Sequence, residues 1–183
     1  MKVTPTALPD VLVIEPVIFA DPRGCFGETY RADRYAALGI RETFVQDNIS
    51  FSHRGVVRGL HYQHPHGQAK LVYVVQGEVL DVAVDVRTDS PTRGRWVSTR
   101  LSSANRFQLY IPVGFAHGFA VLSDHAIVAY KGSDYYAPGS ERCIRWDDDE
   151  LGIDWPSDDP VLSSKDASAP LLRDMPPDHL PRL

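Results

Sequence analysis

Short runs of β-branched and aromatic residues, interrupted by glycine, proline and polar residues, recur along most of the chain. Runs of this kind are typical of an all-β domain folded as a sandwich or a barrel. The pattern predicts strands at residues 11–17, 24–30, 44–50, 56–62, 70–75, 79–86, 96–101, 107–111, 118–122, 126–131 and 143–146.

The clearest predicted hairpin joins residues 71–75 to residues 79–85 through Gln76-Gly77, because glycine takes the positive φ that a tight turn needs. In the second arm the alternation places Leu80, Val82 and Val84 on one face and Asp81, Ala83 and Asp85 on the other. We therefore expect one buried face and one wetter face in this strand.

Helical signals are few. Residues 32–38 predict one short helix that ends at Gly39. From about residue 156 the sequence is acidic and rich in proline, which favours an irregular tail lying over the barrel rather than a second core. The 183 residues are enough for one domain that encloses a ligand cavity, so we expect a single domain over residues 1–183.

The charge balance argues against broad electrostatic binding. With 19 basic and 24 acidic side chains the net charge is -5, so we expect neither a nucleic-acid partner nor an anionic membrane. Cys25 and Cys143 are the only cysteines and no apolar leader is recognisable, which favours a reducing cytoplasm. The longest apolar stretches, such as residues 71–75, are far shorter than the roughly 20 residues that span a bilayer.

Four histidines raise the question of a metal site: His61, His64, His66 and His117. The segment His64-Pro65-His66 is similar to the first metal-binding motif of cupins, in which a glutamate ligand follows the His-x-His pair. Lys70 occupies the position of that glutamate, and a protonated lysine has no lone pair to donate and repels a cation. We therefore expect no metal and no cofactor, and interpret His64 and His66 as loop residues. Residues 112–118 resemble the second cupin motif, Pro-x-Gly-x-x-His, which supports the fold more than a metal.

Lys70 fits proton transfer beside a ketone if its ammonium group faces the barrel interior. Such chemistry needs a cation or donor at the carbonyl oxygen, a base near neutral pKa and a second acid that returns the proton. Lys70, His61 and Tyr130 supply these three types, and residues from different strands can face opposite sides of a sugar ring. Arg58 and His61 would face opposite sides of a regular strand, so we expect a bulge or bend near Gly59.

Further blocks of sequence follow one another in a fixed order along the chain. They lie at residues 55–63, 68–72, 76–78, 111–119, 130–131, 134–138, 144–148, 152–156, 164–166 and 169–171. The longest reads Gly55-Val56-Val57-Arg58-Gly59-Leu60-His61-Tyr62-Gln63. Together these blocks resemble the dTDP-4-dehydrorhamnose 3,5-epimerase family from residue 21 to residue 172, which is far more specific than one short motif.

The resemblance implies a cupin-type jelly-roll β-barrel with a few short peripheral helices. It implies epimerisation at C3 and C5 of dTDP-4-dehydro-6-deoxy-D-glucose, giving dTDP-4-dehydro-L-rhamnose. By the same resemblance His61 removes both protons, Asp166 orients His61, Tyr130 is the acid on the other face, and Lys70 stabilises the enolate oxygen. Substrate contacts are implied at Arg23, Glu28, Gln46, Asn48, Arg58, His117, Glu141 and Lys165. Amino-terminal strands cross between subunits in this family, so a homodimer is expected in which Arg23 and Glu28 serve the partner's pocket.

Three other functions stay open at this point. One is a single-site epimerase acting at C3 or C5 of a related TDP-4-ketosugar. Another is a metal-dependent cupin enzyme using His64, His66 and His117, and the third is a binding module without catalysis. Purely structural interpretations also exist: packing for His61 and Tyr130, surface ion pairs for the arginines, and a turn for Asp166.

Overall fold

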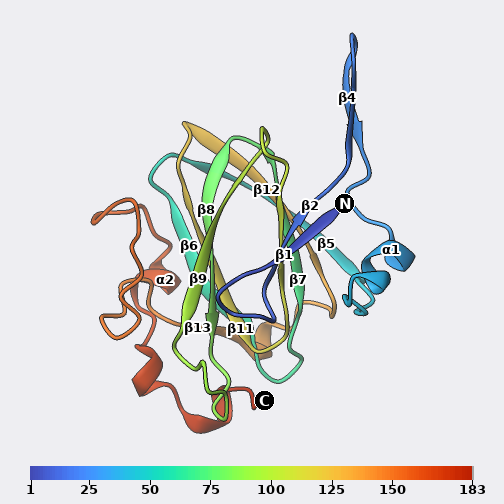
Figure 1. Ribbon diagram of the computed structural model, residues 1–183. Helices are drawn as coiled ribbons and strands as arrows, with labels where there is room; N and C mark the ends of the chain where they lie inside the picture. Colours follow the sequence, from blue (N-terminus) through green and yellow to red (C-terminus); the bar gives the residue numbers. More distant parts are fainter. Residues whose placement is uncertain (183) are drawn as a thin grey trace.

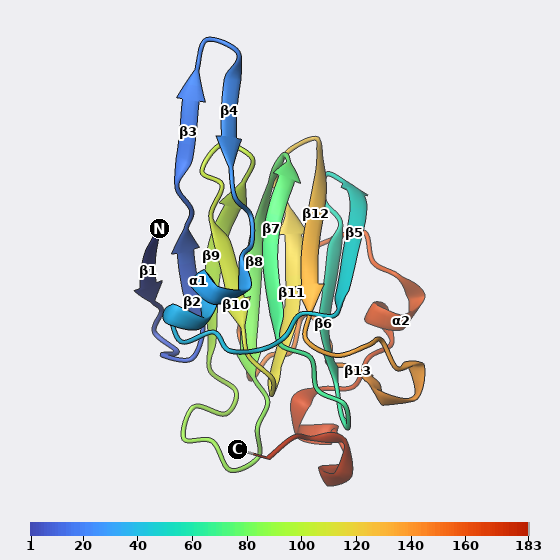
Figure 2. The ribbon, with the colours of Figure 1, turned by 90° about the vertical axis from the view of Figure 1, so that its right-hand side faces the viewer.

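The computed structural model describes residues 1–182 and contains two antiparallel sheets that pack face to face (Figures 1 and 2). In spatial order the first sheet consists of β1 (Lys2–Pro5), β2 (Leu12–Glu15), β10 (Gln108–Ile111), β7 (Lys70–Gln76), β12 (His125–Gly132) and β5 (Gln46–His53). The second consists of β13 (Glu141–Cys143), β6 (Val57–Gln63), β11 (Phe115–Val121), β8 (Glu78–Asp85) and β9 (Trp96–Ser102). Most neighbours within a sheet come from distant parts of the chain, as in a jelly roll, so the predicted all-β, jelly-roll architecture is confirmed.

Each strand that the sequence predicts overlaps an observed strand, although β13 shares only Cys143 with its predicted run. The pattern does not predict β1 or β3 (Ile18–Asp21), which are only four residues long each. The predicted helix is present as α1 (Ala32–Ala37), and Gly39 just beyond it has a φ of +95°. Helical turns otherwise occur only as α2 (Ser164–Ala167), η1 (Pro138–Ser140), η2 (Leu172–Asp174) and η3 (Pro177–His179) among the described residues.

The main hydrophobic core lies between the sheets. Val72 and Val128 of the first sheet meet Ala83, Leu101 and Phe119 of the second, and all five are buried. Full burial of a large apolar side chain stabilises the fold by about 1.5–3 kcal/mol, so this layer holds the two sheets together.

The chain after β13 packs across the outer face of the second sheet (Figure 1). Trp155, Leu172 and Met175 of the tail are buried against a cluster that includes Val82 and Val84 of β8. The helix α2 lies against β6. Apolar burial therefore places the tail beside the strand that carries His61.

The predicted hairpin of β7 and β8 is wrong. β7 pairs with β10 and β12 in the first sheet, whereas β8 pairs with β9 and β11 in the second. Gly77 does have a positive φ of +83°, but its turn carries the chain from one sheet to the other. A tight turn between two alternating strands has the same local sequence signal in both cases, because the signal does not identify the pairing partners.

The predicted wetter face of β8 is also wrong. Asp81 and Asp85 are fully buried, as is Ala83, while the tail covers Val82 and Val84 on the other face. Both faces of β8 are therefore inside the molecule. The two aspartates are accommodated by hydrogen bonds, Asp81 with His117 and Asp85 with Arg87, Ser90 and Thr92.

A two-stranded hairpin of β3 and β4 (Gly24–Gly27) projects away from the two sheets (Figures 1 and 2). Phe19 and Phe26 are register partners on this hairpin, and 64% and 72% of their respective surfaces are exposed. Large apolar side chains so exposed on a projecting element are typical of a contact with another chain.

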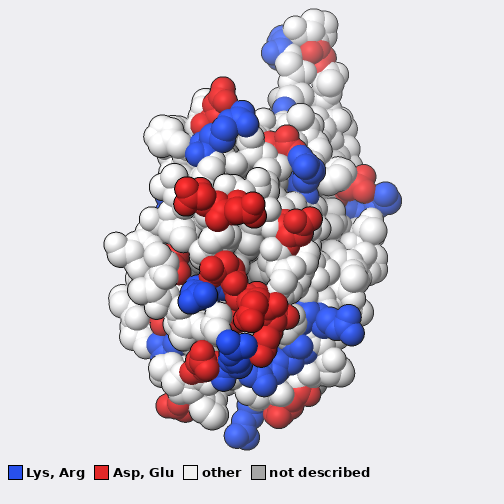
Figure 3. All heavy atoms as spheres, turned by 90° about the vertical axis from the view of Figure 1, so that its left-hand side faces the viewer, with Lys and Arg blue, Asp and Glu red and all other residues white. Residues whose placement is uncertain are grey.

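The surface carries charges of both signs. On the face drawn in Figure 3, acidic side chains gather in the middle and basic ones are spread along the length of the molecule among them. None of the helices in the described part of the chain combines the length and the apolar character needed to cross a bilayer.

Candidate active site

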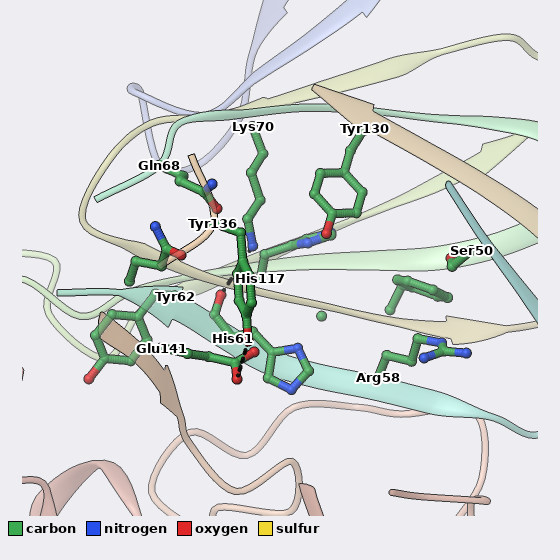
Figure 4. A pocket seen from close by; sticks show the side chains of 13 residues that line it. Ser50, Arg58, His61, Tyr62, Gln68, Lys70, His117, Tyr130, Tyr136 and Glu141 are labelled. Atoms are coloured by element: carbon green, nitrogen blue, oxygen red, sulfur yellow. Dashed lines mark hydrogen bonds between the residues drawn. The ribbon is translucent and has the colours of Figure 1, made fainter. Parts of the chain in front are cut away.

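A cavity of about 180 Å³ lies between the two sheets. Lys70 on β7 and Tyr130 on β12 line it from the first sheet, and Arg58 and His61 on β6 line it from the second. Figure 4 shows Lys70 and Tyr130 extending across the cavity toward His61 and Arg58. The structure thus brings together the three proton-handling groups that the sequence singles out, with the tyrosine and the histidine on opposite walls.

Arg58 and His61 share one wall because β6 is irregular between them. Gly59 has a φ of +134°, and the register of β6 against β11 shifts at this point. A Cβ atom at Gly59 would lie 2.5 Å from the Cα of Gly118, so a side chain is excluded by space as well as by φ. The bend predicted near Gly59 is confirmed.

Asp166 reaches His61 from the tail. It lies on α2 with only 2% of its surface exposed, and its Oδ1 is 2.7 Å from Nε2 of His61. Burial tends to raise the pKa of Asp166, but the hydrogen bonds from His61 and Ser163 outweigh it and the pKa falls below its ordinary value. Because a carboxylate only accepts hydrogen bonds, the neutral imidazole carries its proton on Nε2 and leaves the lone pair on Nδ1.

The amine of Lys70 lies inside the barrel. The residue is 9% exposed, and its Nζ donates a hydrogen bond to the main-chain oxygen of His61 at 3.3 Å. Burial lowers the pKa of Lys70 to about 8, while the carboxylates of Asp81 and Glu141 oppose that shift. At pH 7 the group is therefore mostly an ammonium ion that faces the cavity.

Tyr130 presents its hydroxyl group to the cavity while its ring packs against the core (Figure 4). Burial and the nearby carboxylate of Glu141 raise the pKa of Tyr130 above its ordinary value. The phenol consequently stays protonated at neutral pH and can donate a proton.

His117, which lines the cavity, forms a second histidine-carboxylate pair with Asp81. Nε2 of His117 is 3.0 Å from both carboxylate oxygens of Asp81, and the exposed fractions are 6% and 0%. Burial lowers the pKa of His117, although the charge of Asp81 opposes this shift.

The structure does not bring together the ligands of the metal-dependent alternative. His117 lines the cavity, but His64 and His66 are not among the residues that line it. His66 is exposed and lies 3.9 Å from Asp134. The interpretation of His66 as a loop residue therefore agrees with its position.

Glu141 and Lys165 form an ion pair of 2.8 Å at the edge of the cavity. The hydroxyl of Tyr136 donates to the other oxygen of Glu141 at 3.2 Å. Burial raises the pKa of Glu141, but the lysine more than compensates, and the net shift is downward. Glu141 lines the cavity and Lys165 supports it from outside.

Gln46 and Asn48 lie on β5 rather than in the cavity wall, and Asn48 is the register partner of Tyr130. The amide of Gln46 donates to Oδ1 of Asn48 at 2.9 Å, and its oxygen accepts from the backbone of Tyr136 at 2.8 Å. Arg58, which does line the cavity, donates to Ser52 at 2.9 Å.

Arg23 and Glu28 lie outside the cavity of their own chain. Arg23 belongs to the turn of the projecting hairpin, has 90% of its side chain exposed and pairs with Asp21. Glu28 follows β4 and pairs with Arg34 at 2.9 Å. The resemblance implies substrate contacts for both residues, and neither belongs to the lining of this cavity in the same chain.

Several residues that line the cavity are not predicted from the sequence as site residues: Ser50, Gln63, Gln68 and Tyr136. Strand alternation offers a signal for two of them, because Gln63 follows His61 by two positions and Gln68 precedes Lys70 by two. The pairing of Asp81 with His117 is also missed, since the alternation assigns Asp81 to the wetter face of β8.

A family model described as dTDP-4-dehydrorhamnose 3,5-epimerase matches residues 5–174. The chain belongs to this family. A family member from Salmonella typhimurium, named dTDP-4-dehydrorhamnose 3,5-epimerase, is 53% identical over 94% of this chain and 96% of its own length.

Solved structures of the epimerase family agree with the fold described above. A crystal structure of a dTDP-6-deoxy-D-glucose-3,5-epimerase from Legionella pneumophila, in complex with dTDP-4-keto-L-rhamnose, superposes with a TM-score of 0.97 and 51% identity. It covers 100% of this chain and 98% of the Legionella chain. The chain is also similar to a protein from Streptomyces niveus named dTDP-4-dehydrorhamnose 3-epimerase, at 45% identity over 94% of this chain and 84% of the relative's length.

Proposed function

We propose that this chain converts dTDP-4-dehydro-6-deoxy-D-glucose to dTDP-4-dehydro-L-rhamnose by epimerisation at C3 and C5. The observation that carries the proposal is the position of His61, Lys70 and Tyr130 around one cavity, with the base and the acid on opposite sheets. Family membership and the relatives named above support the same substrate.

His61 removes the proton. The carbons C3 and C5 both neighbour the C4 ketone, so loss of a proton from either places negative charge on the C4 oxygen. Nδ1 of His61 carries the free lone pair, because Nε2 is engaged with Asp166. As the imidazole gains a proton it becomes cationic, and the nearby carboxylate stabilises that cation.

Lys70 stabilises the enolate. A fixed ammonium group in a water-poor cavity stabilises a developing oxyanion more than the same group would in water. Tyr130 then donates its proton to the opposite face of the carbon, which inverts the stereocentre. His61 releases its proton to solvent and Tyr130 regains one, so the cycle can repeat at the second carbon.

The cavity is smaller than the roughly 300–1,000 Å³ of pockets that enclose a drug-sized ligand. We infer that it holds the sugar ring while the nucleoside diphosphate extends across its mouth. Arg58 lies on the cavity wall with an exposed side chain, and guanidinium groups bind phosphate oxygens bidentately. Arg58 is accordingly the diphosphate contact in the same chain, and Glu141 with Lys165 contributes polar groups at the rim.

We further propose a homodimer in which the β3–β4 hairpin of each subunit reaches the partner's pocket. The projecting hairpin, its exposed Phe19 and Phe26, and the absence of Arg23 from the lining of the cavity that holds His61 support this arrangement. The cytoplasm is the proposed location, because both cysteines are free and suit a reducing compartment.

Proton exchange tests the reaction. The protein is incubated with the 4-keto sugar nucleotide in deuterium oxide, and the sugar protons are followed by NMR. Deuterium at both C3 and C5 of an L-configured product is expected. Folded protein that leaves both positions unlabelled in the true substrate rules the proposal out.

The second candidate is a single-site epimerase, which the 3-epimerase relative from Streptomyces niveus brings into view. A single-site epimerase also needs a base, an acid and a group that stabilises the enolate. The same NMR experiment separates the two, because a single-site enzyme gives a product labelled and inverted at one carbon only.

A further inference from the structure

A thiol lies beside the His61–Asp166 pair and has no part in the proton transfers described above. Cys143 on β13 is the register partner of His61 on β6, so the two side chains emerge beside one another. Sγ of Cys143 is 3.7 Å from Oδ1 of Asp166, the same oxygen that lies 2.7 Å from Nε2 of His61. One imidazole nitrogen, one sulfur and one carboxylate oxygen therefore converge within 4.8 Å of one another.

This ligand set matches the chemistry of a thiophilic divalent cation. Zinc binds thiolate sulfur at about 2.3 Å, and imidazole nitrogen and carboxylate oxygen at about 2.0–2.2 Å, in tetrahedral geometry. Those bond lengths separate sulfur from oxygen by about 3.6 Å and nitrogen from oxygen by about 3.3 Å. The sulfur and oxygen atoms, 3.7 Å apart, already have nearly the first separation, whereas the nitrogen and oxygen atoms, 2.7 Å apart, must move apart by about 0.6 Å.

We propose that His61, Cys143 and Asp166 form an inhibitory site for Zn²⁺ or a similar thiophilic cation. The inhibition, though not the binding, rests on the proposed role of His61 as the base. His61 lines the cavity and keeps 27% of its side chain exposed, so we expect a cation to enter from the cavity, past the His61 ring. The fourth position of the tetrahedron is left for water.

Binding balances both protons and charge. The S–H bond of Cys143 breaks, its proton goes to solvent and a Zn–S bond forms, while the imidazole proton moves from Nε2 to Nδ1 as Nε2 binds the metal. The cation, the thiolate and the carboxylate then sum to zero charge. A buried thiolate beside Asp166 is otherwise unfavourable, because burial and that carboxylate raise the pKa of Cys143 to about 12.

The same proton movement explains why the bound cation would stop the reaction. With Nε2 on the metal, Nδ1 carries the proton and has no lone pair for a substrate carbon. The cation also attracts the carboxylate of Asp166, which no longer stabilises an imidazolium. Loss of activity should therefore follow occupancy of the site, without any change in the fold.

A titration with Co²⁺ and Zn²⁺ tests the proposal. The full-length protein, reduced with a phosphine that contains no thiol, is titrated with Co²⁺ and the thiolate-to-cobalt absorption band is measured. Epimerase activity is then measured against Zn²⁺ and after addition of EDTA. The test variants are Cys143→Ser and Cys143→Ala, and the matched control is Cys25→Ser, which removes the exposed thiol on the hairpin.

The wild type and Cys25→Ser should show the cobalt band and EDTA-reversible inhibition by Zn²⁺. Both Cys143 variants should lose the band and need at least ~10-fold more Zn²⁺ for half-inhibition, while their activity without metal stays close to wild type. Each bound cation releases one proton from Cys143. The apparent affinity for the cation should therefore increase about tenfold for each unit by which the pH is raised, as long as the pH is below the pKa of the thiol.

The site is disproved if the wild type gives no band, or if either Cys143 variant responds to both metals as the wild type does. The band does not depend on catalysis, so a protein that binds cobalt through Cys143 but epimerises nothing would refute the proposed function and leave the metal site intact.

Discussion

Nε2 of His61 lies 2.7 Å from Oδ1 of Asp166, a residue 105 positions further along the chain. His61 belongs to β6 of the second sheet, whereas Asp166 belongs to α2 of the tail that packs over that sheet. The orientation of the imidazole therefore depends on docking of the tail as well as on the barrel itself.

The Asp166→Asn variant tests this relationship. The neutral amide can still accept a hydrogen bond from Nε2, but it no longer stabilises a cationic imidazole, so turnover should fall about 100-fold or more. Steady-state kinetics with the 4-keto sugar nucleotide measure the loss, and binding of dTDP checks that the pocket persists. Turnover equal to wild type would remove Asp166 from the site.

Tyr130→Phe should separate proton removal from inversion. His61 can still remove a proton and return one from solvent to the same face, so recovered substrate should acquire deuterium while product formation falls about 100-fold or more. His61→Asn should abolish both the exchange and the product. If Tyr130→Phe made product at the wild-type rate, the acid would have to be another group.

The reaction should slow as the pH rises through about 8. Burial lowers the pKa of Lys70 to about 8, and only the protonated form stabilises the enolate, so kcat/KM should decline about tenfold per pH unit above that value. Tyr130 does not account for such a decline, because its pKa is raised. A pH profile of kcat/KM that stays level to about pH 10 would contradict the role assigned to the ammonium group.

The buried ammonium group of Lys70 should also lower the free energy of unfolding. Its pKa is about 8 in the folded chain against an ordinary value of 10.5, so the unfolded chain binds more protons between those values and wild-type stability rises with pH in that window. Lys70→Met should be inactive and more stable at pH 7 by about 2–3 kcal/mol. Urea unfolding at equal protein concentration measures the difference, which should shrink as the pH rises from about 8 to 10.5 and vanish above that, where the lysine is neutral in both states. A variant no more stable than wild type would mean that the ammonium ion carries little desolvation cost.

The strands and the proton-handling residues could be predicted, because alternation and residue type are local properties of the sequence. The pairing of the strands with one another could not be predicted. Gln76-Gly77 predicts a tight turn correctly, yet nothing in the flanking alternation tells whether β7 and β8 pair or enter different sheets. The burial of Asp81 and the closeness of Cys143 to His61 depend on those pairings, so neither could be read from the sequence alone.

Complementation between two defective subunits tests the exchanged hairpin. Arg23→Ala removes a guanidinium from the hairpin, and His61→Asn removes the base from the barrel. If hairpins cross between subunits, a heterodimer of the two variants contains one pocket with both defects and one pocket with none. Co-expression with two different affinity tags, followed by sequential purification, should then give about half the wild-type activity per dimer, while each variant alone is much less active.

If each hairpin serves its own chain, every pocket carries one defect and the heterodimer is no more active than the mean of the two parent variants. A monomer in solution would likewise exclude the exchange, because a single chain has no partner pocket for the hairpin that carries Arg23.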